Sequence, residues 1–316
     1  MIRVKGALEI AAELYARQMS SLGDELKISF TSKDSRANRP LSLSLAVNGR
    51  LMGGMRAPLE VARRRVDIAY VNPSAIATMA YRGKGIYKQK LPLRALACFP
   101  SWDRIAFAVS RDLKIRSLYE IAARKIPLRV STRLAGVDNA TYYAVSKILS
   151  LYGLSPARIK QWGGEIEECD RPSSPRRMQS ILNRQVGAVF DEGISKWLDE
   201  ALANGYELVE LEPKIIREME RYGFKGAAIP KTRFKSLPRD VRTIDFSGWP
   251  LITHKWLDEG VAYSICEAID RRRDFIPVDS GSLDMEKLCR DTEDAALGIP
   301  LHAGARRYYR QNGYLT

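Results

Sequence analysis

The sequence predicts an α/β fold built in two lobes with mostly parallel sheets, and three observations support this prediction. The chain has 316 residues, 45% of them hydrophobic. A chain of this length and composition can bury a large core, and it often divides into two domains. From residue 27 onward, short apolar runs alternate with helical patterns, which is typical of parallel sheets covered by helices. The chain has no internal repeat and no long linker, so the lobes are expected to be joined by short crossings.

The elements are predicted in chain order from these patterns. Strands are expected at residues 27–31, 42–47, 66–71, 93–99, 105–109, 128–131, 186–190 and 207–211, where apolar residues form short runs. Helices are expected at residues 4–21, 58–65, 74–81, 117–124, 140–152, 175–183, 194–203, 213–222, 260–271 and 305–312. Two boundaries carry signals of their own. Ser117 and Glu120 have the spacing of a capping box, and Gly153 stands where a left-handed C-cap is expected.

The first helix also bears on export. Its apolar residues recur at helical spacing, and Glu9, Glu13 and Arg17 interrupt what would have to be the apolar region of a secretory signal. The segment therefore reads as an amphipathic helix of the fold. A periplasmic location is expected if a leader was removed or lies upstream, and a cytoplasmic location is the alternative.

Composition excludes several classes of protein. No apolar run approaches the ~18 residues of a membrane helix, so a soluble protein is expected. The four cysteines are scattered without a Cys-x-x-Cys pair, and the chain has two histidines. We therefore expect no metal site and no cofactor, and we expect free thiols, although an even count permits disulfides in an exported chain. The cysteines are Cys98, Cys169, Cys266 and Cys289.

The net charge of +14 raises the question of a nucleic-acid partner. The arginine runs at residues 63–65 and 271–273 stand at predicted helix ends, and no nucleic-acid-binding motif accompanies them. We therefore expect solvated basic faces and no nucleic-acid partner. The second interpretation is a positive potential that attracts an anionic small molecule or an acidic partner surface.

The crossing between lobes is expected at residues 99–104, where a proline-bearing bend separates two apolar strands. This gives a discontinuous first lobe of residues 1–103 and 241–316, and a second lobe of residues 104–240. Trp102 lies in this crossing and is expected either to contact a ligand or to pack between the lobes.

Candidate ligand contacts follow from the rule that ligands of open α/β sheets bind beyond the carboxyl ends of strands, near helix N-termini. The expected binding residues in these loops are Asn72, Ser74, Ser131, Arg133, Asp138, Asn139, Thr141, Asp191 and Glu192. Arg133 could pair with a ligand carboxylate, and Asp191 and Glu192 could bind an amine or cap the next helix. The alternatives are structural, because Asn, Ser and Asp at such places also cap helices, and Arg133 could be a surface residue of a loop. Trp162 is a further candidate, with loop packing as its alternative.

Three stretches resemble the TAXI group of solute receptors for TRAP transporters, and the thiamine-precursor-type binding proteins of the same fold. They are VDIAYVNPS at residues 66–74, AVFDE at 188–192 and IPLHAGARRYY at 299–309. The resemblance implies a type II periplasmic-binding-protein fold with an interlobe cleft that closes over an organic acid or amino acid. It also implies transporter subunits as partners. Residues 136–141 correspond to the family's glycine-rich loop in a looser form, and Gly53 and Gly54 are expected to replace a loop that relatives carry before the first helix.

Three functional classes are compatible with this fold: a solute-binding protein, an enzyme acting on a small organic acid or pyrimidine-like compound, and a cytoplasmic sensor. The chain lacks a nucleophile elbow, a phosphate loop and a dinucleotide fingerprint. His254 has no nucleophile in its vicinity, and His302 is expected to serve a structural turn. We therefore expect a non-enzymatic protein that binds a small anionic or zwitterionic solute.

Overall fold

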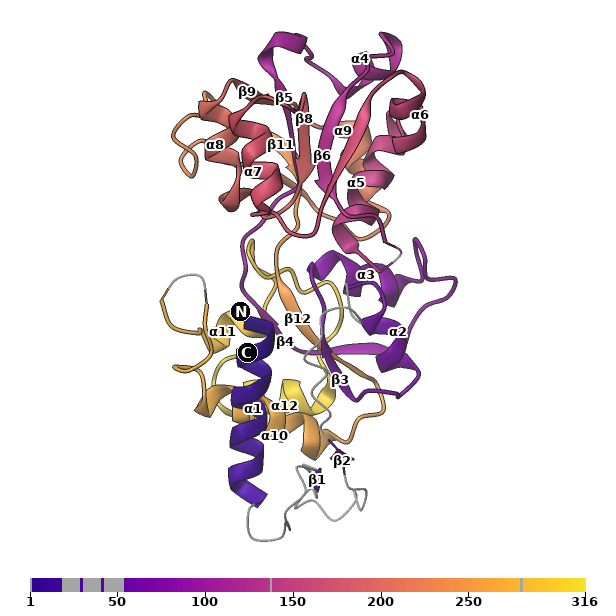
Figure 1. Ribbon diagram of the computed structural model, residues 1–316. Coiled ribbons are helices and arrows are strands. Elements are labelled where there is room, and N and C mark those ends of the chain that lie inside the picture. The colour runs from indigo at the N-terminus through magenta and orange to yellow at the C-terminus, as the bar shows by residue number, and fades with distance from the viewer. Residues whose placement is uncertain (1, 19–28, 31–40, 43–53, 137, 279–280) are drawn as a thin grey trace. The chain divides into compact units, whose positions relative to one another are not determined.

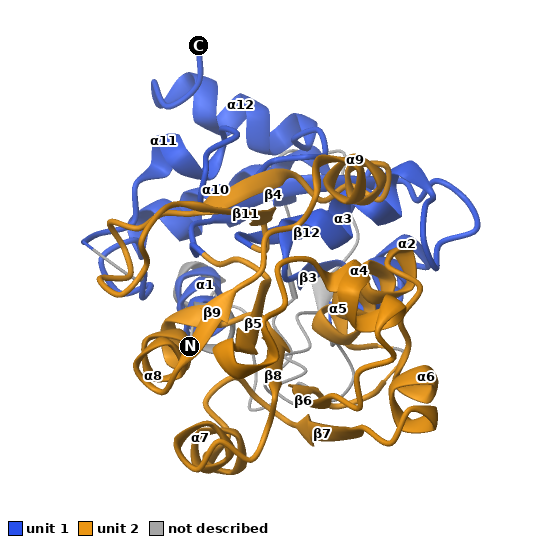
Figure 2. Ribbon diagram, turned by 90° about the horizontal axis from the view of Figure 1, so that it is seen from above, with its two compact units in different colours: residues 1–102, 247–316 blue, residues 103–246 orange. Residues whose placement is uncertain are grey.

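The computed structural model describes residues 2–18, 29–30, 41–42, 54–136, 138–278 and 281–316. The chain forms two compact units, coloured separately in Figure 2. Unit 1 comprises residues 1–102 and 247–316, and unit 2 comprises residues 103–246.

Unit 1 has a three-stranded sheet in the order β3-β12-β4, in which β12 is antiparallel to both neighbours. Helix α10 packs against α1 and α12 (Figure 1). The elements of this unit are α1 (Ile2–Gln18), β1 (Ser29–Phe30), β2 (Leu41–Ser42), α2 (Ala57–Ala62), β3 (Ile68–Tyr70), α3 (Ser74–Arg82), β4 (Leu93–Phe99), β12 (Trp249–His254), α10 (Glu259–Arg271), α11 (Met285–Leu288) and α12 (Ala303–Gln311).

The stretch at residues 299–309 joins α12 to the sheet of unit 1. Leu301 bridges Ala95 of β4, and the backbone N–H of His302 donates to the Ala95 carbonyl at 2.8 Å. The His302 ring nitrogen Nδ1 accepts the backbone N–H of Gly304 at 3.2 Å and so caps α12. His302 therefore has the structural role expected from the sequence.

Unit 2 has a five-stranded mixed sheet in the order β7-β6-β8-β5-β9. Strand β6 is parallel to β7 and β8, whereas β5 is antiparallel to β8 and β9. Helices α7 and α8 lie on one side of this sheet and α4, α5 and α6 on the other (Figures 1 and 2). The elements are β5 (Ala106–Ser110), η2 (Arg111–Leu113), α4 (Leu118–Ala123), β6 (Arg129–Arg133), α5 (Ala140–Leu151), α6 (Pro156–Gln161), β7 (Glu165–Cys169), α7 (Pro175–Leu182), β8 (Ala188–Asp191), η3 (Ile194–Lys196), α8 (Leu198–Ala203), β9 (Tyr206–Leu208), α9 (Pro213–Glu220), β10 (Gly226–Ile229) and β11 (Val241–Ile244).

Two short connecting segments join the units, at residues 102–103 and 246–247. They pair with each other, because Phe246 donates its N–H to the Asp103 carbonyl at 3.1 Å and Gly248 donates to Ser101 at 3.0 Å. The chain returns to unit 1 at residue 247, six residues after the predicted boundary at residue 241. The reason is that β11 pairs with β10 and so belongs to unit 2.

The α/β class is confirmed, but the expectation of mostly parallel sheets is wrong. The strands of unit 1 pair antiparallel, because β12 returns between β3 and β4, and the sheet of unit 2 is mixed, because β5 enters it against β8. The predicted capping box is confirmed, since Ser117 accepts the Tyr119 N–H while Glu120 accepts the Ser117 N–H. Gly153 has φ +74 directly after α5, as the C-cap signal predicted.

Among the described helices, none is long and apolar enough to cross a membrane. All four cysteines are buried as free thiols. In the described ranges, no three His, Cys, Asp or Glu side chains are grouped so that they could hold a metal ion.

Candidate functional site

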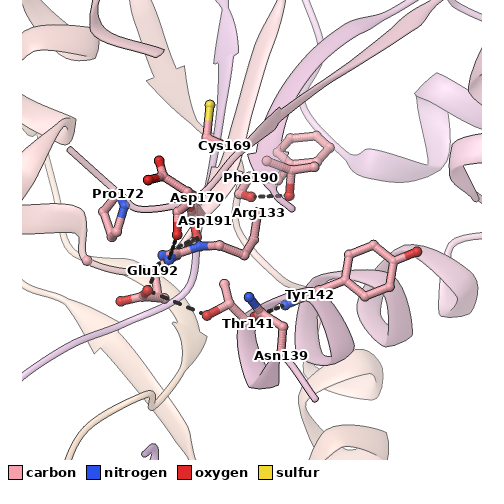
Figure 3. A network of polar contacts seen from close by, with 12 residues as sticks. Arg133, Asn139, Thr141, Tyr142, Cys169, Asp170, Pro172, Phe190, Asp191 and Glu192 are labelled. Atoms are coloured by element: carbon pink, nitrogen blue, oxygen red, sulfur yellow. Dashed lines mark hydrogen bonds and ion pairs between the residues drawn. The ribbon is translucent and has the colours of Figure 1, made fainter. Parts of the chain in front are cut away.

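Unit 2 brings charged side chains together where two neighbouring strands end. Arg133 is the last residue of β6, and Asp191 is the last residue of β8. Because these strands are parallel and Thr132 pairs with Phe190, Arg133 and Asp191 leave the sheet at the same edge. Figure 3 shows the two side chains meeting there, with Glu192 and the start of α5 beside them. We call this place the β6–β8 edge.

Arg133 makes several hydrogen bonds inside unit 2. Its Nε and Nη2 atoms donate to Asp191 Oδ1 at 3.3 and 3.2 Å, and Nη2 also donates to Glu192 Oε1. Its Nη1 atom donates to the Asp170 carbonyl at 3.1 Å. The side chain is only 9% exposed. The guanidinium group is therefore held in place by protein acceptors.

A second arginine lies deeper, on α7. Arg177 is fully buried, forms an ion pair through Nη1 with Asp191 Oδ2, and donates from Nε to Ser131 Oγ at 3.1 Å. Nη1 also donates to the Pro172 carbonyl at 3.2 Å, whereas the buried Nη2 atom has no hydrogen-bond partner among the described residues. Asp191 thus lies between two guanidinium groups. This arrangement is required chemically, since a buried carboxylate is stable only when paired.

Asp103 connects the first connecting segment to the loop after β8. Its carboxylate accepts the backbone N–H groups of Gly193 at 2.8 Å and Ile194 at 3.4 Å, and it is hydrogen-bonded to Glu192. Gly193 has φ +61, and a Cβ atom at this position would overlap the Pro172 ring. The loop therefore needs glycine to pass at this place.

Burial raises the pKa of Glu192 well above its ordinary value, and the charge of Asp103 raises it further, while Arg133 acts in the opposite direction. Burial also raises the pKa of Asp103, against the hydrogen bonds that it accepts. The cause is physical, because two carboxyl groups in hydrogen-bond contact away from water cannot both be charged without cost. We place the shared proton on Glu192, which donates it to Asp103.

The start of α5 completes the β6–β8 edge. Asn139 caps the helix by accepting the Tyr142 N–H at 3.0 Å, and Thr141 Oγ1 lies 3.5 Å from Glu192 Oε1 (Figure 3). Leu134, directly after β6, is 49% exposed, and Gly136 faces open space. The edge therefore offers helix N–H groups and a carboxyl group next to one another, and an exposed apolar side chain follows β6.

The predicted site residues do not all lie together in the structure. Arg133, Asn139, Thr141, Asp191 and Glu192 come together at the β6–β8 edge (Figure 3). Asp138 is half-buried in the loop before Asn139. Ser131 is fully buried beneath the edge, where its hydroxyl accepts from Arg177.

The remaining predicted residues, apart from Trp162, belong to unit 1. Asn72 does not cap α3, as its place before the helix suggested, because its side chain donates to the Gly248 carbonyl at 3.3 Å and Pro73 is the N-cap residue. Ser74 is buried, and its hydroxyl lies 3.3 Å from Cys98 Sγ. Trp102 ends the first segment of unit 1 and is half-buried, as Asp103 after it is. Gly54 is buried with φ +79, and Gly53 lies outside the described residues.

Trp162 does not belong to the β6–β8 edge. It precedes β7, which is parallel to β6 with Arg129 opposite Glu165 and Arg133 opposite Cys169. Trp162 therefore lies at the opposite end of the sheet, where strands begin. Trp162 thus does not join the other unit 2 candidates at the β6–β8 edge.

Sequence reasoning missed Asp103 and Arg177. Asp103 follows Trp102, which was a candidate, but nothing in the sequence distinguishes it from an exposed loop residue. Arg177 adjoins Arg176 in a helix rich in polar residues, and only packing shows that one is buried and the other 67% exposed.

The chain is similar to several solved structures. The chain is similar in structure to XAC2383 from Xanthomonas citri bound to chloride ion, at 12% identity and a TM-score of 0.40, over 80% of this chain and 78% of that one. It is similar to MatC from Rhodopseudomonas palustris with bound malate, at 13% identity and a TM-score of 0.40, over 98% and 90%. It is also similar to the binding component of a phosphonate transporter from Pseudomonas aeruginosa, at 10% identity and a TM-score of 0.37, over 67% and 58%.

The family assignment rests on a different comparison. The NMT1-like family matches residues 52–313, which is most of the chain and includes both units. The protein belongs to the NMT1-like family.

Proposed function

We propose that this protein binds a small organic solute at the β6–β8 edge and delivers it to a membrane transporter. The observation that carries the proposal is the meeting of Arg133, Glu192 and the start of α5 beyond the ends of two parallel strands. Ligands of α/β sheets bind at this kind of position, where helix N–H groups and side chains converge.

The charges at the edge favour a zwitterion within the class that the sequence predicted, which was anionic or zwitterionic. Arg133 and Arg177 both pair with Asp191, and the charge of Asp103 also acts on Arg133, so the positive charges at the edge are balanced without a charge on Glu192. A solute with a single negative charge would find little uncompensated positive charge there. A zwitterion can use the helix N–H groups for its acidic end and a carboxyl group for its basic end.

The resemblance of three stretches supports a membrane transporter as the partner. The stretches at residues 66–74, 188–192 and 299–309 resemble TAXI receptors, and a TRAP-type transporter in the membrane, with this protein in the periplasm, is the corresponding proposal. Among the similar structures, MatC has malate bound, and the protein from Pseudomonas aeruginosa is the binding component of an ABC phosphonate transporter.

The two histidines do not support an enzymatic role. Both histidines lie in unit 1, where His302 caps α12 and His254 is buried with Nε2 3.8 Å from Asp67. Neither has a serine or cysteine nucleophile among its described hydrogen-bond partners, so the arrangement for activating a nucleophile is not formed. We therefore propose a binding protein and not an enzyme.

A thermal-shift screen tests this proposal. The purified protein is heated with amino acids, amines, dicarboxylates, keto acids and aromatic acids, because a solute that binds the folded state raises its melting temperature. The proposal expects a concentration-dependent rise for at least one class, without conversion of the solute by mass spectrometry. Conversion of a solute, or no rise with any class, would contradict it.

A further inference from the structure

We infer that the β6–β8 edge takes the cationic end of the solute, an ammonium or amidinium group, on the Glu192 carboxyl group in exchange for a proton. This inference rests on the proposed function, since it names the chemistry of the solute bound at the same place. It assigns the specificity to Glu192, whereas Arg133 was the residue that the sequence suggested for an anion.

The first argument is the hydrogen bonding of Arg133. A guanidinium group has five N–H donors, and the contacts to Asp191, Glu192 and the Asp170 carbonyl use four of them. The bidentate approach that lets arginine hold a carboxylate needs two parallel donors. Arg133 therefore cannot hold a ligand carboxylate in this way without giving up Asp191, which is fully buried.

The second argument is the balance of charges in the cluster. Two guanidinium groups, Arg133 and Arg177, face three carboxyl groups, Asp103, Asp191 and Glu192. With the proton on Glu192, the cluster is neutral. An anion would add an uncompensated negative charge, whereas a cation can replace the proton and leave the sum unchanged.

The Glu192 carboxyl group is accessible to a solute. Glu192 is the most exposed of the carboxyl groups that contact Arg133, with 16% of its side chain exposed against none for Asp191. Thr141 from α5 reaches the same carboxyl group, and Leu134 lies exposed in the loop that leads from β6 toward α5. A cationic group can approach Glu192 here.

The exchange is balanced. The Glu192 carboxyl proton leaves to solvent, and the resulting carboxylate forms an ion pair with the incoming cation, while no other group changes its charge. The groups that act on Glu192 are Asp103 on the connecting segment, Arg133 on β6 and Asp191 on β8, with Arg177 on α7 behind Asp191. The raised pKa of Glu192 agrees with a protonated Glu192 side chain before the solute binds. It follows that cation affinity rises by at most about tenfold per pH unit while Glu192 is protonated.

Titration calorimetry with matched solutes tests the inference. The probes are 4-aminobutanoate, butylamine and butanoate, together with the corresponding triplet for each hit of the thermal-shift screen. We expect the probes with an ammonium group to bind about tenfold to a hundredfold more tightly than the acid without it, as for a buried charged hydrogen bond. In two buffers of different ionisation enthalpy, binding should release close to one proton.

Glu192→Gln is the decisive variant. Glutamine resembles the protonated acid, so this variant should fold with a melting temperature near that of the wild type, lose about tenfold or more in affinity for ammonium probes, and release no proton. Glu165→Gln is the control, because Glu165 is 68% exposed and begins β7 at the other end of the sheet. This control should bind as the wild type does.

The outcomes separate the two proposals. If acids without a cationic group are the tightest binders, or if Glu192→Gln binds ammonium probes as well as the wild type, the inference is overturned and solute binding stands. If no solute of any class binds, the proposed function itself fails.

Discussion

Replacing Arg177 tests how much the buried charge cluster contributes to the stability of unit 2. The Arg177 side chain is fully buried and pairs with Asp191, which is also fully buried. Arg177→Met leaves Asp191 with Arg133 as its only guanidinium partner among the described residues. Removing one member of a buried pair costs about 3–5 kcal/mol, a large part of the 5–15 kcal/mol that stabilises a typical domain.

Arg184→Met is the matched control, since Arg184 lies just after α7. Its side chain is 61% exposed and lies 3.8 Å from Asp112, which is 80% exposed, so its loss should cost about 0–1 kcal/mol. Urea unfolding followed by circular dichroism measures both. Equal losses for the two variants would refute the description of Asp191 as a carboxylate that depends on Arg177.

Three other predictions concern groups away from the β6–β8 edge. Ser117→Ala should lower the unfolding free energy by about 0.5–2 kcal/mol, because it removes the cap of α4; no change in urea unfolding would contradict this. Burial lowers the pKa of His302, so its neutral, capping form should stabilise the fold fully above pH ~6.5 and lose this contribution as pH falls through the lowered pKa. His302→Asn should keep the cap and flatten this pH dependence, and an unchanged slope would exclude His302 as its source. All four cysteines are buried, and burial raises the pKa of the Cys266 thiol, so a thiol reagent should label them slowly in the folded protein and all four in urea; rapid labelling of the folded protein would contradict this.

Much of the β6–β8 edge could be predicted from the sequence, because the rule behind it is local. Arg133 and Asp191 each end an apolar run, and parallel strands place such residues at one edge of a sheet. The partners of these residues could not be predicted in the same way. Whether Arg176 or Arg177 faces the core depends on how α7 packs, which the sequence does not reveal.

The strands that escaped prediction also have physical reasons. Strand β12 contains Pro250, which argues against a central strand. The structure accommodates it with a shift of register after Leu251, while the Pro250 carbonyl accepts the Val71 N–H. Strand β7 carries three glutamates in five residues, which is compatible with a strand only because β7 lies at the edge of the sheet.

Hydrogen exchange with and without the tightest-binding solute tests the central claim most directly, which is that a solute binds at the β6–β8 edge. The first turn of α5 has N–H groups without helical partners, and the loop after β8 carries Glu192. We predict slower exchange in residues 134–143 and 191–194 when the solute is bound. Slower exchange confined to unit 1, or unchanged exchange in both segments at saturating solute, would contradict the account.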